Sequence, residues 1–432
     1  MNDRLPRLTL RANFSWAFVG SIVYAAAQWG MLVVLTKLGS PEMVGVFAIG
    51  LAVGTPIMAF ATLKTRLVQA TDAKQTYQFG HYLGLRLMTT AVAFVIIVGI
   101  VLVVDYEPAV AWVILVLGLQ KAAESLSDVL YGLFQQRERM DMMAISRVIK
   151  GPLSLIALGL GVYLTGSLHY GVLGMTLVWL ILLFAYDFVS CARLLRGDNW
   201  RETIKAVLPR WDLRPLAQLA WLALPLGIVV LLESLATNIP RYFIERQLGV
   251  YLLGIFAAMA YLKRAGQTFI IAWGLSAAPR LAQHYSNGDV RSFRRLLNRL
   301  VLMGVVLGAG GVVVASLWGR PLLTLLYNSE YAAYQTIFVI LILAAGVDYV
   351  ATFIDYGMTA ARQFRQQMIL FISLVAGETL ICYLLIPRGA LLGAATAVLS
   401  AAFIRLVGGW LIIRRAIAAC PHPAEIVEPA LV

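Results

Sequence analysis

Charged residues are scarce in this chain. Of its 432 residues, 13% are Asp, Glu, Lys or Arg and 60% are hydrophobic, whereas a soluble domain carries about 25% charged residues. Charged residues this few cannot cover the surface of a soluble protein of this length, and a soluble globular protein is therefore excluded. The hydrophobic residues form continuous runs instead of the short alternating segments of a membrane β-barrel. The composition therefore predicts an all-α integral membrane protein.

Cysteine and histidine are also rare. The three cysteines form no CxxC pair and the four histidines are isolated; they are Cys191, Cys382, Cys420, His81, His169, His284 and His422. This spacing argues against a disulfide framework or a thiolate metal site, and we expect neither a metal nor a cofactor. The phosphate-binding motif GxxxxGK[ST] is absent, which argues against an ATP-driven pump.

The hydrophobic runs are long enough to cross a hydrocarbon core of about 30 Å as helices. We expect about 12 transmembrane helices, near 13–36, 44–64, 83–104, 108–130, 146–165, 170–191, 216–237, 250–275, 297–318, 334–358, 366–386 and 390–413. The first run follows three arginines, but it is longer than the apolar part of a signal peptide. We therefore interpret it as a spanning helix.

The basic residues fall in alternate loops. Most of the 35 lysines and arginines lie on one side of the predicted membrane, and the loops of the other side hold only Lys37, Arg241, Arg246, Arg320 and Arg388. Because cytoplasmic loops collect Lys and Arg, the basic side and both termini are predicted to be cytoplasmic. This distribution also explains the net charge of +13. No basic stretch has the interleaved aromatics of a nucleic-acid surface, so we expect no nucleic-acid partner.

The two halves of the sequence contain similar short segments. Four landmarks recur in the same order: 45–48 with 254–257, 66–69 with 280–283, 131–132 with 356–357, and 171–174 with 389–393. Such repeats suit a transporter whose halves move about a central site. We expect an N-terminal six-helix bundle (1–191), a cytoplasmic connector (192–215), a C-terminal six-helix bundle (216–415) and a disordered cytoplasmic tail (416–432).

The landmarks also carry a family resemblance. The residues concerned are Arg11–Phe14, Leu38–Glu42, Arg66, Asp72, Arg86, Tyr131–Arg137 and Ile145–Arg147. At these positions the chain resembles the polysaccharide flippases of the multidrug/oligosaccharidyl-lipid/polysaccharide exporter superfamily. The resemblance implies two six-helix bundles around a cavity that opens alternately to each leaflet of the cell inner membrane. It also implies a substrate, a polyprenyl-pyrophosphate-linked oligosaccharide moved from the cytoplasmic to the periplasmic leaflet for lipopolysaccharide, capsule or exopolysaccharide assembly.

Cations inside predicted spans are candidates for binding the pyrophosphate, because an uncompensated charge is costly in the bilayer. Lys263 and Arg264 are the strongest pair, since apolar residues flank them on both sides. Arg66, Arg86 and Arg11 are further candidates near cytoplasmic helix ends, where contact with anionic lipid headgroups is the alternative role. For Lys263 and Arg264 the alternative is a salt bridge with an acidic neighbour.

Several carboxylates also lie within predicted spans. Lys121, Glu124, Ser125 and Asp128 have the spacing of one helix face, and Asp348 shares a face with Asp355. Glu124, Asp128, Asp348 and Glu378 are candidates for a coupling ion, H⁺ or Na⁺. The alternative is neutralisation by neighbours, which predicts two ion pairs: Lys121 with Glu124, and Arg405 with Glu378. Pro56 and Pro225 interrupt two spans and are candidate hinges, with a static kink as the alternative.

Two other functions are open. A multidrug antiporter of the same superfamily would share the helix count and the repeat, but it would favour an acidic cavity for organic cations, whereas Lys263 and Arg264 favour an anion. A membrane polysaccharide polymerase or ligase would need a catalytic constellation on a sizeable outer loop. The longest predicted outer loop, 238–249, holds only Arg241, Glu245 and Arg246 as charged residues. A secondary transporter is therefore favoured over an enzyme.

Overall fold

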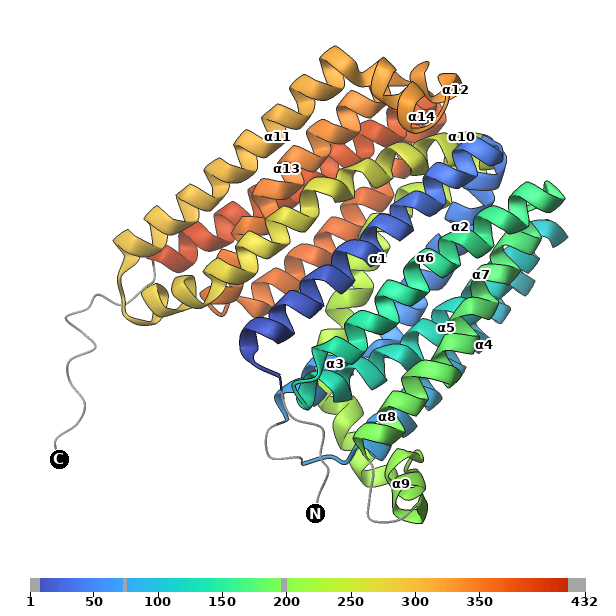
Figure 1. Ribbon diagram of the computed structural model, residues 1–432. Helices are drawn as coiled ribbons and strands as arrows, with labels where there is room; N and C mark the ends of the chain where they lie inside the picture. Colours follow the sequence, from blue (N-terminus) through green and yellow to red (C-terminus); the bar gives the residue numbers. More distant parts are fainter. Residues whose placement is uncertain (1–7, 73–75, 196–199, 419–432) are drawn as a thin grey trace. The chain divides into compact units, whose positions relative to one another are not determined.

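The computed structural model describes residues 8–72, 76–195 and 200–418 (Figure 1). Its described residues form helices joined by short turns and contain no strand. The predicted all-α fold is thus confirmed. The chain divides into two compact units, Met1–Leu235 and Ala236–Val432, here called unit 1 and unit 2.

Unit 1 is a bundle of long apolar helices with short helices at their ends. The elements are α1 (Leu10–Leu38), α2 (Pro41–Thr62), α3 (Thr65–Thr71), α4 (Phe79–Val104), α5 (Pro108–Gln136), α6 (Met140–Thr165), α7 (Leu168–Leu182), the π-helix η1 (Leu183–Phe188), α8 (Val189–Leu194), α9 (Trp200–Val207) and the first part of α10 (Leu213–Ser286). Helix α5 packs against α2, α3, α4 and α7, and α6 packs against α1 and α7 (Figure 1). Helix α5 is therefore central to this unit.

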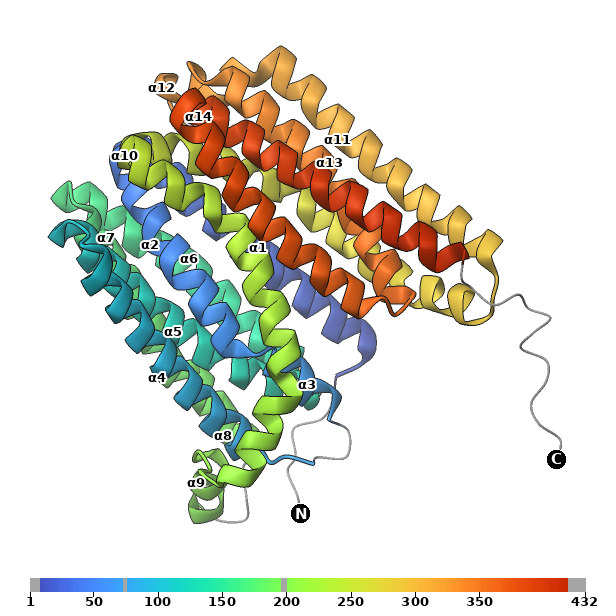
Figure 2. The same ribbon diagram turned by 180° about the vertical axis from the view of Figure 1, so that it is seen from behind.

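Unit 2 contains the rest of α10, then α11 (Val290–Leu326), α12 (Ser329–Ala332), α13 (Gln335–Ala360) and α14 (Phe364–Ala418). Helix α13 packs against both α11 and α14, an arrangement seen from behind in Figure 2. A buried apolar cluster joins the four long helices, with Ile270 from α10, Leu297 from α11, Phe353 from α13 and Leu370 from α14. Burial of such side chains orients each helix about its own axis.

Within the described residues, ten helices are long and apolar enough to cross a membrane by length and composition. Eleven of the twelve predicted spans lie within them, and the span 334–358 begins one residue before α13. The span 170–191 continues from α7 through η1 into α8. Two of the ten contain a non-helical residue where two predicted spans meet. In α10 it is Gly249 (φ 85°, ψ 171°), between the spans 216–237 and 250–275, and in α14 it is Ala390 (φ 47°, ψ −131°), the first residue of the span 390–413. A multi-pass membrane protein is confirmed, whereas the count of twelve spans and their orientation stay predictions.

Some segments differ from the sequence prediction. The expected outer loop 238–249 is helical up to Gly249, because its apolar and long side chains continue the pattern of α10. The expected connector contains a short helix, α9. At the C-terminus α14 continues to Ala418, so the start of the predicted disordered tail is helical, and residues 419–432 lie outside the described part of the chain.

Candidate functional site

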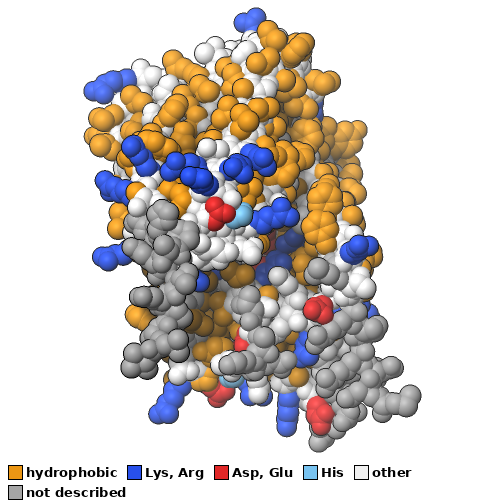
Figure 3. All heavy atoms as spheres, turned by 90° about the vertical axis from the view of Figure 1, so that its left-hand side faces the viewer, with side chains coloured by type: hydrophobic (Ala, Val, Ile, Leu, Met, Phe, Trp, Pro, Cys, Tyr) orange, Lys and Arg blue, Asp and Glu red, His pale blue; other side chains and the backbone are white. Residues whose placement is uncertain are grey.

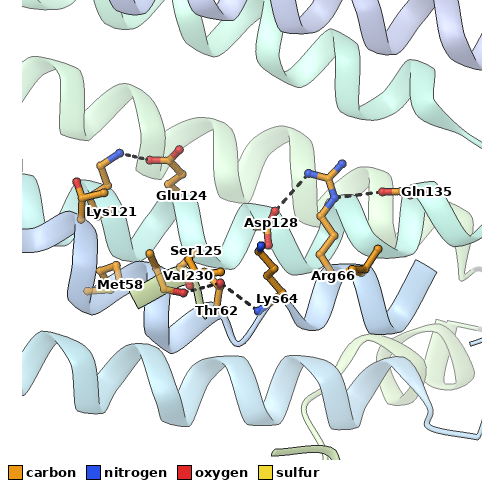
Figure 4. Close-up of a pocket in the computed structure, with 13 residues that line it drawn as sticks. Met58, Thr62, Lys64, Arg66, Lys121, Glu124, Ser125, Asp128, Gln135 and Val230 are labelled. Carbon is orange, nitrogen blue, oxygen red and sulfur yellow. Dashed lines mark hydrogen bonds and ion pairs between the residues drawn. The ribbon is translucent and has the colours of Figure 1, made fainter. Parts of the chain in front are cut away.

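One face of α5 lines a pocket of about 430 Å³ in unit 1 (Figure 4). Its lining residues are Thr55, Met58, Ala59, Thr62, Lys64, Arg66, Leu67, Lys121, Glu124, Ser125, Asp128, Gln135 and Val230. The four polar α5 residues predicted to share a face all belong to this lining, because residues three, four and seven apart return to the same side of a helix. The pocket thus gathers charged groups from α5 and from the junction of α2 and α3.

Asp128 holds two arginines at this pocket. Arg66 Nη1 lies 3.3 Å from Asp128 Oδ1, and Arg86 Nη2 lies 3.3 Å from Asp128 Oδ2. The side chain of Arg86 is fully buried and also donates to Thr65 Oγ1 at 2.6 Å and to Ser125. The predicted alternative, contact of Arg86 with lipid headgroups, is therefore wrong, since protein encloses its guanidinium. Arg86 is also absent from the pocket lining, and its role in binding the substrate stays a prediction. Arg66 is partly exposed to the pocket.

Lys121 and Glu124 form the predicted ion pair. Lys121 Nζ lies 2.7 Å from Glu124 Oε2, and the hydroxyl of Tyr24 donates to Glu124 Oε1 at 3.3 Å. Both coupling-ion candidates of unit 1, Glu124 and Asp128, are thus carboxylates with cationic partners. The sequence prediction that the α5 charges neutralise one another holds for Lys121 and Glu124.

Lys64, the last residue of the predicted span 44–64, is a cation of this pocket that the sequence prediction did not name as a candidate. It stands with Leu63 between α2 and α3, and both residues have left-handed backbone angles (φ 46° and 47°). Its backbone N–H donates to Thr62 Oγ1 (Figure 4). Its ammonium group forms no ion pair with any residue that the structure describes. Left-handed residues other than glycine are uncommon, so nothing in the sequence indicates a break of two such residues. Lys64 is therefore a half-buried cation without an ion-pair partner among the described residues.

A second charged cluster lies in unit 2. Lys263 of α10 forms an ion pair with Asp348 of α13. Arg405 of α14 contacts Asp348 at 3.6 Å and Asp355 at 2.5 Å. The predicted partner of Arg405 was Glu378, and this prediction is wrong because the seven-residue spacing of the two aspartates brings both to Arg405. For Lys263 the predicted alternative, a salt bridge with an acidic neighbour, is correct.

Arg264 and Lys263 have different surroundings. Consecutive helix residues point about 100° apart, and Arg264 is exposed with its guanidinium 5.0 Å from the ring centroid of Tyr261. Tyr349 donates to the backbone oxygen of Lys263 at 2.8 Å. The pair that stood out in the sequence is therefore split between a neutralised lysine and an exposed arginine.

Glu378 is a buried carboxylate in the same cluster. It is 3% exposed and interacts electrostatically with Lys263 and Asp348, yet it forms no ion pair or hydrogen bond with the described residues. Its two neighbours instead pair with each other. Of the four coupling-ion candidates, Glu378 is the one without a direct cationic partner in the described chain.

The remaining candidates are placed as follows. Arg11 is exposed in the first turn of α1. Pro56 is buried inside α2, and Pro225 is exposed on α10. The backbone stays helical at both prolines, since the break in α10 lies at Gly249. Their role as hinges stays a prediction.

A buried ion pair in unit 1 was missed by the sequence prediction, which counted Lys150, near the start of the predicted span 146–165, with the basic residues of the cytoplasmic side. Lys150 of α6 pairs with Asp187 of η1, and both side chains are fully buried. Lys150 also donates to Ser127 at 2.7 Å and lies 4.7 Å from the ring centroid of Trp179. The signal that could have revealed the pair was an aspartate inside the span 170–191, since intramembrane acids need partners.

Asp72 anchors the chain just beyond α3, outside the spanning segments. It accepts hydrogen bonds from the backbone N–H groups of Thr76 (3.0 Å) and Tyr77 (3.1 Å) and from the hydroxyl of Tyr82 (3.2 Å). Partial burial raises the pKa of Asp72, but these hydrogen bonds outweigh it and hold the pKa below its usual value. The carboxylate thus ties the segment after α3 to the start of α4.

The described residues hold no group of three or more His, Cys, Asp or Glu side chains that could bind a metal ion.

A family model described as "Polysaccharide biosynthesis protein" matches residues 10–285, well over half of the chain. The chain belongs to this family. This polysaccharide biosynthesis protein is also similar to the capsular polysaccharide biosynthesis protein CapF of Staphylococcus aureus. The two are 28% identical over 405 residues, which cover 93% of this chain and 99% of CapF.

Solved structures of transporters share the fold of this polysaccharide biosynthesis protein. An inward-facing multidrug resistance MATE family transporter of the MOP superfamily superimposes with a TM-score of 0.68 at 14% identity, covering 94% of this chain and all of the other. A mutant of the VcmN MATE transporter of Vibrio cholerae gives 0.57 at 13% identity, covering 95% and 98%. The predicted family resemblance is therefore confirmed, and the fold is that of MOP-superfamily transporters.

Proposed function

We propose that this chain is a flippase that moves a polyprenyl-pyrophosphate-linked oligosaccharide from the cytoplasmic to the periplasmic leaflet of the cell inner membrane. The observation that carries the proposal is the cationic pocket of unit 1 in a member of a polysaccharide biosynthesis family. Its transporter-like fold supports movement of a substrate across the membrane over chemical conversion. The name of CapF supports a capsule-type glycan.

The charge of the pocket suits a phosphate-bearing headgroup. Three cations line it against two carboxylates: Lys64, Arg66 and Lys121 against Glu124 and Asp128. Arg86 adds a further positive charge behind Asp128, so that carboxylate already serves two arginines. Lys64 forms no ion pair with the described residues and is the cation available to an incoming pyrophosphate, which a lysine binds as a point charge. Lys263 is occupied by Asp348, so we assign it a supporting role in unit 2.

A multidrug antiporter is the competing function, because the similar solved structures are multidrug transporters. An excess of positive charge repels organic cations and attracts phosphates, so the pocket favours the flippase. We propose that H⁺ or Na⁺ couples to transport through Glu378, with Asp348, Glu124 and Asp128 as further carboxylates, and that Pro56 and Pro225 serve as hinges of alternating access.

The test is translocation of a lipid-linked oligosaccharide in proteoliposomes containing purified protein. Native protein is expected to move the lipid to the opposite leaflet, and Lys64→Ala is expected to slow it by about tenfold, the effect of losing one charge-assisted contact. Lys205→Ala is the matched control, since Lys205 is an exposed lysine of α9 that does not belong to the pocket lining. A Lys263→Ala/Arg264→Ala variant tests the unit 2 cations in the same assay.

Three outcomes would contradict the proposal. Equal translocation rates for native protein and Lys64→Ala would show that Lys64 does not bind the substrate. Transport of organic cations without movement of the lipid would favour the antiporter. Extension or transfer of the glycan by purified protein would favour an enzyme. Thermal unfolding midpoints of all variants in detergent separate loss of transport from loss of fold.

A further inference from the structure

The first three turns of α11 carry a basic face. This face consists of Arg291 and the three arginines that follow it after three, four and eight residues, Arg294, Arg295 and Arg299. Residues with this spacing lie on one side of a helix. With Val290, Asn298 and Leu302 they line a groove of about 500 Å³. Figure 3 views the side of the molecule where α11 begins, and there Lys and Arg side chains gather next to hydrophobic surface. We call the four arginines and Asn298 the α11 groove.

The charge of the α11 groove is not neutralised by the described chain. None of its four guanidinium groups forms an ion pair or hydrogen bond with a described residue. Asp289 is the neighbouring acid and interacts electrostatically with Arg295, but its carboxylate is engaged at the start of the helix. It accepts from the backbone N–H of Ser292 at 2.9 Å and lies 3.7 Å from His284. Three or more positive charges therefore remain available to an anionic ligand.

The side of α11 opposite the groove is buried, so the groove faces away from the interior of unit 2. Phe293, Leu297 and Leu300 are buried in the apolar cluster of unit 2. Farther along the groove side, Leu302 and Val306 are exposed aliphatic residues. A basic groove thus continues directly into an apolar stripe on the same side of one helix. This is the order of groups in a phospholipid, from its phosphate to its acyl chains.

The length of α11 places this transition at headgroup depth. The helix has 37 residues, about 55 Å at 1.5 Å per residue, whereas a hydrocarbon core is about 30 Å thick. Several turns of α11 must therefore stand outside the hydrocarbon. The arginine-bearing turns are the polar end, since the apolar part of the helix follows them.

The internal repeat shows that the fold does not require these arginines. Aligning Arg299 with Arg86 places Gln78, His81 and Tyr82 opposite the other three arginines of the groove. Arg86 itself is buried against Asp128 in unit 1. The corresponding helix start in unit 1 therefore has no exposed arginine face, and the groove is a property of unit 2 alone.

We propose that the α11 groove is a binding site for the phosphate headgroup of an anionic membrane phospholipid, whose acyl chains lie along Leu302 and Val306. Guanidinium groups bind phosphate through paired hydrogen bonds, which a cluster on one helix face offers in several places. The site is independent of the substrate pocket of unit 1, and the inference does not rest on the proposed function.

Native mass spectrometry of the delipidated full-length protein in detergent tests the site. Cardiolipin and phosphatidylglycerol are expected to bind, and phosphatidylcholine is expected to bind at least about tenfold more weakly, because it carries no net charge. The variant Arg291→Gln/Arg294→Gln/Arg295→Gln/Arg299→Gln is expected to lose this preference for anionic lipid. The control variant Lys205→Gln/Arg214→Gln/Arg365→Gln/Arg415→Gln removes the same charge from exposed, scattered positions and is expected to keep the preference.

Two results would overturn the proposal. Equal loss of anionic lipid from the groove variant and the control variant would show that net charge alone attracts lipid. Displacement of phospholipid by an equimolar polyprenyl pyrophosphate, abolished in the groove variant, would assign the groove to the transported substrate. Replacing the four arginines by lysine keeps the charge, and recovery of binding in that variant supports the site if the glutamine variant is less stable.

Discussion

Arg66 and Arg86 share the carboxylate of Asp128, but the two guanidinium groups stand in different surroundings. Arg86 is enclosed by α3, α4 and α5, whereas Arg66 reaches the pocket. The same contrast recurs in unit 2, where Lys263 is paired with Asp348 and Arg264 is exposed. Single charged residues of this protein are therefore either structural or available to a ligand, and the partner on the neighbouring helix decides which.

The buried pair of Lys150 and Asp187 makes a stability prediction. Asp187→Leu leaves an unpaired lysine ammonium in the interior of unit 1 and is expected to destabilise the protein by about 3–5 kcal/mol, as breaking a buried pair does. Lys150→Met/Asp187→Leu removes both charges and should recover most of that loss. The measurement is the thermal unfolding midpoint in detergent. A double variant no more stable than Asp187→Leu would show that lost hydrogen bonds, and not the unpaired charge, cause most of the destabilisation.

Glu378 makes a prediction about coupling that rests on the proposed function. Protonation of this buried carboxylate removes a negative charge beside Lys263 and Asp348, and Glu378→Gln fixes the neutral state. Translocation by the variant is expected to lose its dependence on an imposed pH gradient while the protein still folds. Glu330→Gln, at an exposed acid of α12, is the control. Retention of the native gradient dependence in Glu378→Gln would exclude Glu378 as the coupling group.

At the scale of elements, helix breaks divide the longest helices. The helix α10 has 74 residues with one non-helical position, Gly249, and α14 has 55 residues with one, Ala390. The angles of Gly249 (φ 85°, ψ 171°) belong to a region that is essentially confined to glycine. The break at Gly249 therefore depends on its lack of a side chain, whereas the break at Ala390 does not.

Gly249→Ala is expected to destabilise the protein by about 1–3 kcal/mol, because a Cβ atom strains this backbone conformation even though no atom lies within 4 Å of it. Gly99→Ala is a close control. A Cβ atom at Gly99 would also have nothing within 4 Å, but Gly99 lies in the helical backbone of α4, so alanine there should be neutral or stabilise by up to about 1 kcal/mol. Equal thermal midpoints for the two variants would contradict the role of Gly249.

At the scale of the whole molecule, the charge distribution along the chain predicts its orientation in the membrane. Basic loops alternate with loops nearly free of Lys and Arg, and the positive-inside rule then places the basic ones in the cytoplasm. The connection at Glu107, between α4 and α5, belongs to the weakly basic side. The connection at Asn287, between α10 and α11, belongs to the basic side.

Single-cysteine labelling tests this orientation. In a background without the native cysteines, Glu107→Cys is expected to react with a membrane-impermeant maleimide in intact cells, and Asn287→Cys only after the membrane is permeabilised. Both positions are exposed, so failure to react reports the membrane and not burial in the protein. The reverse pattern would invert the predicted topology, and reaction at both sites in intact cells would refute the alternation.

Properties that depend on short stretches of chain could be predicted from the sequence. The helical class and the approximate place of the long apolar helices follow from the length of apolar runs, because an unpaired backbone cannot cross the hydrocarbon outside a helix. The pair of Lys121 and Glu124 follows from their spacing on one helix. The family followed from landmarks such as Tyr131–Arg137, which lie inside the matched region 10–285.

Partners on different helices required the tertiary structure. Arg405 contacts Asp355 and not Glu378, and Lys150 is buried against Asp187 although the sequence prediction counted Lys150 with the basic side of the membrane. The availability of Lys64 depends on a left-handed break between α2 and α3 that no residue type indicates. The physical reason is that helix rotation and packing decide which charges meet, and the energy of a buried charge depends on that meeting more than on its place in the chain.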